Sequence, residues 1–169
     1  MISKNVQRAF NEQINRELFS AYLYAAIAAV FAQKSLDGFA NWFKIQAREE
    51  VAHAEGFFNY IIERGGAVEL GAIASPQFDG ASCADMFAIS LEHEKFVTAS
   101  IDALCDLADA ERDRASTLFL QWYVREQVEE EATFQKILDN LRTIGDNRCA
   151  LMAMDAEFAK REYCAPHIQ

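Results

Sequence analysis

Residues 47–53 of the chain read Ala-Arg-Glu-Glu-Val-Ala-His, and a helical pattern continues on both sides of them. Because positions i and i+3 of a helix share one face, Glu50 and His53 can bind one metal ion together. The other residues on that face are apolar, namely Phe43, Ala54, Phe57 and Ile61. A carboxylate in an apolar core is costly unless a cation compensates its charge. The pair therefore predicts a metal site inside the protein.

Glycine and proline divide the chain into five helical segments. Neither residue occurs before position 38, and most of the others gather at Gly65-Gly66, between residues 71 and 80, and at Gly145. Asp37-Gly38 is interpreted as the turn and N-cap of the second helix, and Ser82 with Asp85 as a capping box of the third. The tail after residue 160 is expected to be loose. The predicted helices cover about residues 5–34, 39–64, 83–108, 113–143 and 147–160.

The lengths of the connections predict the topology. Short turns after the first and third helices make their neighbours antiparallel, whereas residues 65–81 can extend over as much as ~55 Å. The longer helices measure ~40–45 Å, so this link can run the length of the bundle and make the second and third helices parallel. A return to the same end also fits its length. We expect an all-α fold: a four-helix bundle with a long crossover between its second and third helices and a short fifth helix.

The four long helices each carry one acid on the inner stripe, where a bundle core would have leucine: Glu17, Glu50, Glu94 and Glu130. Counted from the nearest turn, all four lie about 25 Å along the bundle, as do His53 and Gln127. No lysine or arginine shares the predicted stripes. The carboxylates must therefore either be protonated or bind metal. Two divalent ions would cancel four negative charges, and oxygen ligands with one imidazole suit iron, manganese or zinc.

The composition argues against several classes of partner. With 169 residues and 51% hydrophobic content, the chain suits one domain, residues 1–169, with a substantial core. Its net charge of −10 and its pI near 4.7 argue against nucleic acid and against an anionic membrane surface as partners. The longest uncharged run, residues 18–33, would span only ~24 Å as a helix, less than the ~30 Å of a bilayer core.

The cysteines and the first residues indicate the compartment. No C-x-x-C pair or zinc-finger spacing occurs, so the thiols are interpreted as free in a reducing compartment. They are Cys83, Cys105, Cys149 and Cys164. Residues 1–5 lack the apolar run of a signal peptide. We expect a cytoplasmic protein.

Di-iron four-helix proteins such as ferritins take one Glu from each of two helices and a Glu-x-x-His motif from each of the other two. This chain has one such motif, and its second segment reads Gln127-Val128-Glu129-Glu130. At these residues the chain resembles the bacterial non-haem ferritins, and the similarity covers nearly its whole length. The similar segments are Asn11-Glu12-Gln13 with Glu17, Glu49-Glu50 with His53, and Leu120-Gln121-Trp122-Tyr123-Val124 followed by Glu126-Gln127 and Glu129-Glu130.

The resemblance implies a role for each of these side chains. The first ferroxidase iron would be held by Glu17, Glu50 and His53. Glu50 would also bridge to a second iron, which would be held by Glu94 and Glu130 with Gln127 beside it. A third, inner iron site would consist of Glu49, Glu126, Glu129 and Glu130. Tyr24, one helical repeat from Glu17, matches a tyrosine that assists electron or proton transfer.

The resemblance also implies a ferritin-like fold and an iron store. Such proteins oxidise Fe(II) with O2 or H2O2 and deposit a ferric mineral inside a homo-oligomeric shell of 24 subunits, with the fifth helix near the fourfold channels. Haem-binding bacterioferritins differ at two positions, which here are Val51 in place of the haem-ligating methionine and Glu130 in place of the second histidine. No haem is therefore expected.

Two other functions fit the same residues. A small di-metal oxidase or peroxidase would keep its metals and build no mineral. A bundle without metal would require four protonated glutamates in its core. Two details are also open: Tyr24 could serve only core packing, and Glu126 with Glu129 could belong to a solvated acidic face.

Overall fold

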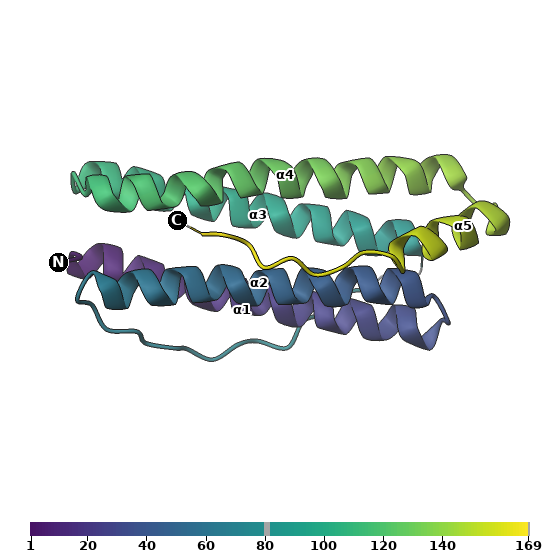
Figure 1. The fold of residues 1–169 in the computed structure, drawn as a ribbon, viewed down its shortest axis with the longest axis horizontal. Helices are drawn as coiled ribbons and strands as arrows, with labels where there is room; N and C mark the ends of the chain where they lie inside the picture. The colour runs from purple at the N-terminus through teal and green to yellow at the C-terminus, as the bar shows by residue number, and fades with distance from the viewer. Residues whose placement is uncertain (80–81, 169) are drawn as a thin grey trace.

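The fold consists of five α-helices in the computed structural model, which describes residues 1–79 and 82–168. They are α1 (Lys4–Gln33), α2 (Asp37–Glu63), α3 (Cys83–Ala110), α4 (Arg114–Ile144) and α5 (Arg148–Phe158). No β-strand occurs within these two ranges. Each helix end lies within two residues of its predicted position. The prediction of an all-α bundle with a short fifth helix is confirmed (Figure 1).

The ends of the long helices follow from turn chemistry. Gly65 and Gly145 have positive φ angles of 73° and 54°, which glycine tolerates without strain, and they follow the ends of α2 and α4. Before α3, Oγ of Ser82 accepts a hydrogen bond of 3.1 Å from the Asp85 N–H. The Asp85 carboxylate accepts one of 2.9 Å from the Ser82 N–H. This pair is the predicted capping box.

The start of α2 differs from the prediction. Asp37 already lies inside the helix, and Leu36 takes the N-cap position without a side-chain hydrogen bond. A side chain of α5 supplies the cap instead, because Oδ1 of Asp155 accepts a 3.0 Å hydrogen bond from the Phe39 N–H. A Cβ atom on Gly38 would lie 1.7 Å from the Asp155 carbonyl oxygen, so only glycine lets α5 come this close. Asp37 as N-cap was therefore wrong, since a distant side chain provides the acceptor.

The connection between α2 and α3 runs along the bundle beside α1 (Figure 1). Asn11 donates to the Ala67 carbonyl at 3.0 Å and accepts from the Glu69 N–H at 2.8 Å. One turn further along α1, Oδ1 of Asn15 accepts a hydrogen bond of 3.1 Å from the Gly71 N–H. The chain thus proceeds toward the opposite end of the bundle. Helices α2 and α3 are parallel, as the long crossover predicted, and each lies antiparallel to its partner in a helix pair.

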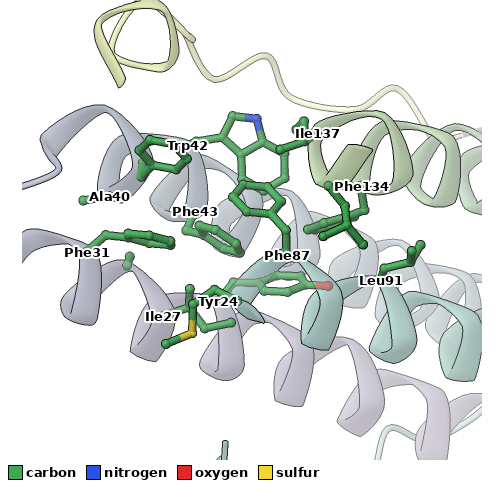
Figure 2. Packing of buried hydrophobic residues seen from close by; sticks show 14 of the residues in the cluster. Tyr24, Ile27, Phe31, Ala40, Trp42, Phe43, Phe87, Leu91, Phe134 and Ile137 are labelled. Atoms are coloured by element: carbon green, nitrogen blue, oxygen red, sulfur yellow. The ribbon is translucent and has the colours of Figure 1, made fainter. Parts of the chain in front are cut away.

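Two apolar clusters fill the bundle, one toward each end. The first, part of which Figure 2 shows, includes Tyr24, Phe31, Trp42, Phe43, Phe87 and Phe134. The second includes Phe10, Ile14, Phe57, Ile101, Phe119 and Leu120. Between them, the four long helices contribute a layer of buried polar side chains: Gln13, Glu17, Gln46, Glu50, His53, Glu94, Gln127 and Glu130. The core is therefore interrupted at the level at which the acids were predicted to meet.

The tail after α5 folds back along the bundle, between α2 and α4 (Figure 1). Arg161 forms an ion pair with Glu49 at 2.6 Å, and the guanidinium carbon of Arg48 lies 3.9 Å from the centre of the Tyr163 ring. Near its end, Ile168 packs against the second apolar cluster. The expectation of a loose tail is wrong for residues 161–168, because side chains of α2 hold the segment. None of the five described helices combines the length and apolar character that a membrane span requires.

Candidate metal centre

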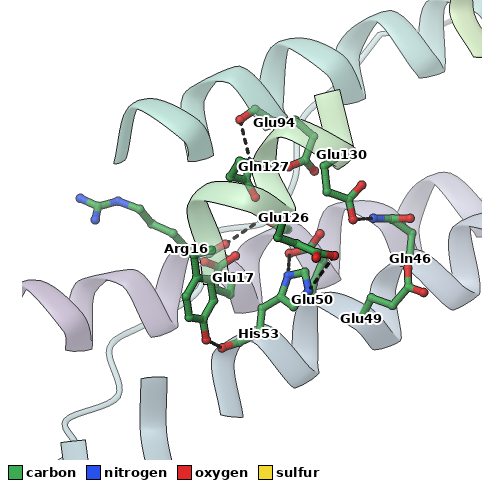
Figure 3. Close-up of polar contacts among 12 residues, drawn as sticks. Arg16, Glu17, Gln46, Glu49, Glu50, His53, Glu94, Glu126, Gln127 and Glu130 are labelled. Carbon is green, nitrogen blue, oxygen red and sulfur yellow. Dashed lines mark hydrogen bonds and ion pairs between the residues drawn. The ribbon is translucent and has the colours of Figure 1, made fainter. Parts of the chain in front are cut away.

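Three side chains from α1 and α2 converge in the polar layer (Figure 3). Glu17, Glu50 and His53 are buried, and their donor atoms all lie within 4.8 Å of one another. Oε2 of Glu50 is 3.4 Å from Nδ1 of His53, as the shared face of positions i and i+3 requires. Two carboxylates and one imidazole at this spacing form a ligand set that suits iron, manganese or zinc.

The imidazole of His53 is neutral at physiological pH. Burial lowers its pKa to about 4, because the charged form would lose its hydration. Its backbone carbonyl accepts a 2.8 Å hydrogen bond from the Tyr123 hydroxyl. Its Nε2, in contrast, is buried, has no hydrogen-bond partner within residues 1–79 and 82–168, and lies 3.8 Å from Oε1 of Glu126. Buried polar atoms are nearly always bonded, so an unpartnered neutral nitrogen among carboxylates fits a metal ligand.

Two further carboxylates enter the layer from α3 and α4, each bonded to a neutral partner. The amide of Gln127 donates to Oε2 of Glu94 at 3.1 Å. The amide of Gln46 donates to Oε1 of Glu130 at 2.6 Å. Both acids lie beside the first group, because Glu94 repels Glu17, and Glu94 and Glu130 both repel Glu50. The group of three mutually close donors, however, contains neither of them.

The four buried carboxylates share one unfavourable electrostatic environment. Burial, followed by repulsion from Glu94, raises the pKa of Glu17 to about 7 and that of Glu50 well above its ordinary range. The same two causes raise the pKa of Glu130 well above its ordinary range. Burial also raises the pKa of Glu94 to about 7. Among the described residues no lysine or arginine is buried with them. Bound cations would reverse these shifts by favouring the ionised carboxylates.

Tyr24 combines packing with a direct contact to the acids. Its hydroxyl donates a short hydrogen bond to Oε1 of Glu94. Its ring stacks on Phe134 with the centroids 5.7 Å apart and packs against Phe43 at 5.8 Å. The side chain is completely buried. A role in packing and a role at the acidic layer are therefore compatible with this position.

The side chains predicted for the inner site are near one another, and one of them, Glu49, contacts the tail. Burial raises the pKa of Glu126 to about 6, with further contributions from Glu129 and Glu49, so the three carboxylates are close enough to repel one another. Glu129 is exposed and Glu126 is half-buried. Glu49 differs from both, because it is already paired with Arg161. We call Glu49, Glu126, Glu129 and Glu130 the inner carboxylate group.

Sequence reasoning missed three side chains that contact the predicted ligands. Gln13 donates to Oε1 of Glu17 at 2.8 Å, Gln46 donates to Glu130, and Arg161 pairs with Glu49. Gln13 and Gln46 each lie four residues before a predicted ligand, so helical periodicity could have placed them on the ligand face. No local pattern marks Arg161, which lies beyond the last helix.

Comparisons with known proteins agree with this architecture. A sequence model of the ferritin-like domain matches residues 7–144. The bacterial non-haem ferritin of Staphylococcus aureus strain MRSA252 is 40% identical over 163 residues, which are 96% of this chain and 98% of the relative. That of Bacteroides fragilis strain 638R is 40% identical over 161 residues, which are 95% of this chain and 100% of the relative.

Solved structures agree with the fold. The open-pore ferritin of the archaeon Archaeoglobus fulgidus is 43% identical, and the match covers 96% of this chain and 100% of that chain with a TM-score of 0.94. A closed form engineered from the same ferritin is also 43% identical, and that match covers 97% of this chain and 100% of that chain with a TM-score of 0.96. The similarity therefore includes α5 and much of the tail as well as the four long helices.

Proposed function

The chain belongs to the ferritin family, whose members store and oxidise iron, and on this basis we propose that it is a ferroxidase and an iron store. It would oxidise Fe(II) with O2 or H2O2 at a dinuclear centre and retain the ferric product as a mineral. The observation that carries this proposal is the convergence in the buried layer of Glu17, Glu50 and His53, whose Nε2 has no hydrogen-bond partner among the described residues. A metal-free bundle would gain nothing from a buried imidazole nitrogen that makes no hydrogen bond among carboxylates.

The proposed ligands divide between two iron ions. Glu17, Glu50 and His53 would bind the first Fe(II), and Glu94 and Glu130 the second, with Glu50 bridging the two. Gln127 is neutral and its amide donates to Glu94, so it adds no negative charge for the second ion. The second ion should therefore be held more loosely than the first. This difference suits iron that moves on to a mineral, and the inner carboxylate group would form a third site on that path.

The chemistry requires two electrons for each oxidant molecule. Two Fe(II) ions give one electron each, so that O2 with two protons becomes H2O2, or H2O2 with two protons becomes two molecules of water. Glu17 and Glu94, whose pKa values are about 7, would release protons when the cations bind. The hydroxyl of Tyr24, which donates to Glu94, lies where it could pass a proton or an electron.

We further propose that copies of this chain assemble into a hollow shell of 24 subunits that contains the mineral. The proposed setting is the cytoplasm, since four free thiols favour a reducing compartment. Membership of the family and the full-length match to ferritin structures support both statements.

Light scattering after size-exclusion chromatography, followed by aerobic addition of several hundred Fe(II) per particle, tests the proposal. A particle near 24 subunits that keeps the iron ferric and in solution is the expected result. A small oligomer that binds about two irons per chain and no more would instead favour a di-iron oxidase that stores nothing. Absence of bound metal under all conditions would favour the bundle with protonated glutamates.

A further inference from the structure

Arg161 is a tail residue whose guanidinium contacts Glu49, one member of the inner carboxylate group. Its Nη2 donates to Oε2 of Glu49 at 2.6 Å. Its Nη1 donates to Oε1 of Gln46 at 3.1 Å and to the Trp42 carbonyl at 3.2 Å. The guanidinium carbon lies 4.6 Å from the centre of the Trp42 ring. One cation therefore makes four contacts with one face of α2.

The backbone of the tail holds Arg161 in this position. The side-chain amide of Asn41 donates to the carbonyls of both Phe158 and Arg161, at 3.1 and 3.0 Å. Two residues further along, the Tyr163 ring lies beside the Arg48 guanidinium. The segment is thus anchored to α2 on both sides of the Arg161 side chain, and its approach to Glu49 is built into the fold.

Arg161 is also linked to the proposed dinuclear centre by hydrogen bonds through the side chain of Gln46. The amide of Gln46 has one acceptor oxygen and one donor nitrogen, and Arg161 occupies the oxygen. The nitrogen must then face Glu130, whose Oε1 it meets at 2.6 Å. Figure 3 shows Gln46 extended toward Glu130, with Glu49 on the same helix. Arg161 therefore contacts one proposed third-site ligand directly and orients a second, Glu130, through Gln46.

We propose that Arg161 is the resident counter-ion of Glu49 in the inner carboxylate group and keeps the binding of a third metal ion weak. This inference rests on the proposed function, because it concerns how iron passes through that site. A metal ion that binds Oε2 of Glu49 must displace the guanidinium that this oxygen already bonds at 2.6 Å, and the loss of this ion pair raises the free energy of the bound state. The inner group then serves as a transit site, from which iron moves on to the mineral.

The test compares Arg161→Gln with Lys160→Gln in the assembled, mineral-free protein. Lys160 is the preceding residue, carries the same charge and forms an ion pair of 2.7 Å with Glu157, and its side chain is 72% exposed. The probe is Zn²⁺, which has no redox chemistry. Calorimetric titration at 0.15 M salt should show a third zinc ion that binds R161Q at least about tenfold more tightly than the wild type. K160Q should match the wild type within about twofold.

The zinc affinities of the variants and of the wild type decide the inference. A third zinc affinity in R161Q no higher than in K160Q would overturn it, and a lower one would mean that Arg161 positions Glu49 for metal rather than competing with it. Arg161→Lys should keep the third zinc weak, because it retains the charge while losing the fork of donors. Binding of fewer than two zinc ions by the wild type would refute the proposed function itself, whereas two normal sites with an unchanged third would refute only the role of Arg161.

A measurement on the wild type decides the inference even if R161Q fails to assemble. Hydrogen–deuterium exchange of the backbone amides in residues 159–168 should speed up with the third equivalent of zinc, since the metal displaces the guanidinium. The first two equivalents should leave this exchange unchanged. Exchange that does not respond to the third equivalent would show that zinc and Arg161 do not compete.

Discussion

Oδ1 of Asp155 in α5 accepts the backbone N–H of Phe39 at 3.0 Å and so caps a helix that begins more than a hundred residues earlier in the chain. Through this contact the fifth helix stabilises the start of α2, the helix that carries Glu50 and His53. Asp155→Ala should therefore destabilise the protein by roughly 1–2 kcal/mol, the usual loss for an N-cap acceptor. The measurement is the melting temperature of the metal-free protein at fixed concentration.

Asp155→Asn is the matched control for this cap. Its side-chain oxygen can still accept from the Phe39 N–H, so most of the stability should be retained. If Asp155→Ala and Asp155→Asn melt at the same temperature, the contact does not contribute as an N-cap.

Glu50→Gln should separate stability from activity. Burial and three neighbouring acids disfavour the ionised form of Glu50. Glutamine keeps the shape of the side chain without its charge, so the metal-free protein should become more stable. It also removes the proposed bridging charge, so Fe(II) oxidation should slow by about a hundredfold or more. Melting temperature and the initial rate of ferric absorbance check the two outcomes.

Glu92→Gln provides the control, because Glu92 is an acid on α3 whose side chain is 71% exposed. Neither its melting temperature nor its oxidation rate should differ much from those of the wild type. A normal rate in Glu50→Gln would remove Glu50 from the proposed centre.

Helical periodicity explains how much of this site could be predicted from the sequence. The 3.6-residue repeat assigns Glu17, Glu50, Glu94 and Glu130 to inner faces, and the constant rise per residue places them at one level. All four are buried in one layer. Both inferences need only distances within a helix and the position of the nearest turn, and these are local properties.

The contacts of α5 and the tail could not be predicted in this way. Asp155 caps Phe39 and Arg161 pairs with Glu49, and in both cases more than a hundred residues separate the partners. Nothing in the sequence near Asp37 shows that a distant acceptor replaces it, since Asp, Asn and Ser are all good local caps. Such contacts depend on where the tail returns to the bundle, which periodicity does not determine.

The metal-free protein should lose stability as pH rises from about 4.5 to 7. The pKa of Glu17 rises from 4.5 to about 7 on folding, and that of Glu94 does the same. An acid with a higher pKa in the folded state binds more protons there, so folding becomes less favourable as the pH passes through this range. The upward shifts of Glu50 and Glu130 act in the same direction.

His53 and His93 oppose this trend, because burial lowers the pKa of each imidazole from 6.5 to about 4 and their contributions to stability increase with pH between those values. These two imidazoles are outnumbered by the four carboxylates of the layer, so the net trend is downward. Melting temperatures measured across this pH range, with and without two Zn²⁺ per chain, check the prediction. Zinc should flatten or reverse the decline, and identical curves would contradict occupation of the carboxylate layer by metal.

Tyr24→Phe tests the hydroxyl without disturbing the ring. The packing against Phe134 and Phe43 remains, so the free energy of unfolding should fall by about 1 kcal/mol at most. The melting temperature should therefore change little. Oxidation of Fe(II) should slow by about tenfold or more if the hydroxyl transfers a proton or an electron from the side of Glu94. Tyr22→Phe, at a tyrosine on the same helix that is 50% exposed, should oxidise iron normally. Equal rates in the two variants would leave Tyr24 with a packing role alone.

Gln127→Glu should tighten the second metal and slow its departure. In the wild type, the Gln127 amide donates to Oε2 of Glu94 at 3.1 Å and to Oγ1 of Thr98 at 3.3 Å. A carboxylate in its place loses the donor and repels Glu94, so the metal-free protein should be less stable than the wild type. With metal present, the added charge lies beside the proposed second ion and should raise its affinity by about tenfold.

These opposite effects make the prediction specific to a metal site. Calorimetry measures the affinity of the second zinc ion, which should rise. The rate of mineral growth after an Fe(II) pulse should fall. Gln121→Glu is the control. Gln121 is exposed on α4, so this substitution adds the same charge away from the layer. If Gln127→Glu destabilises the protein without raising the second zinc affinity, then Gln127 only bonds Glu94, and the second ion is held by a different set of side chains.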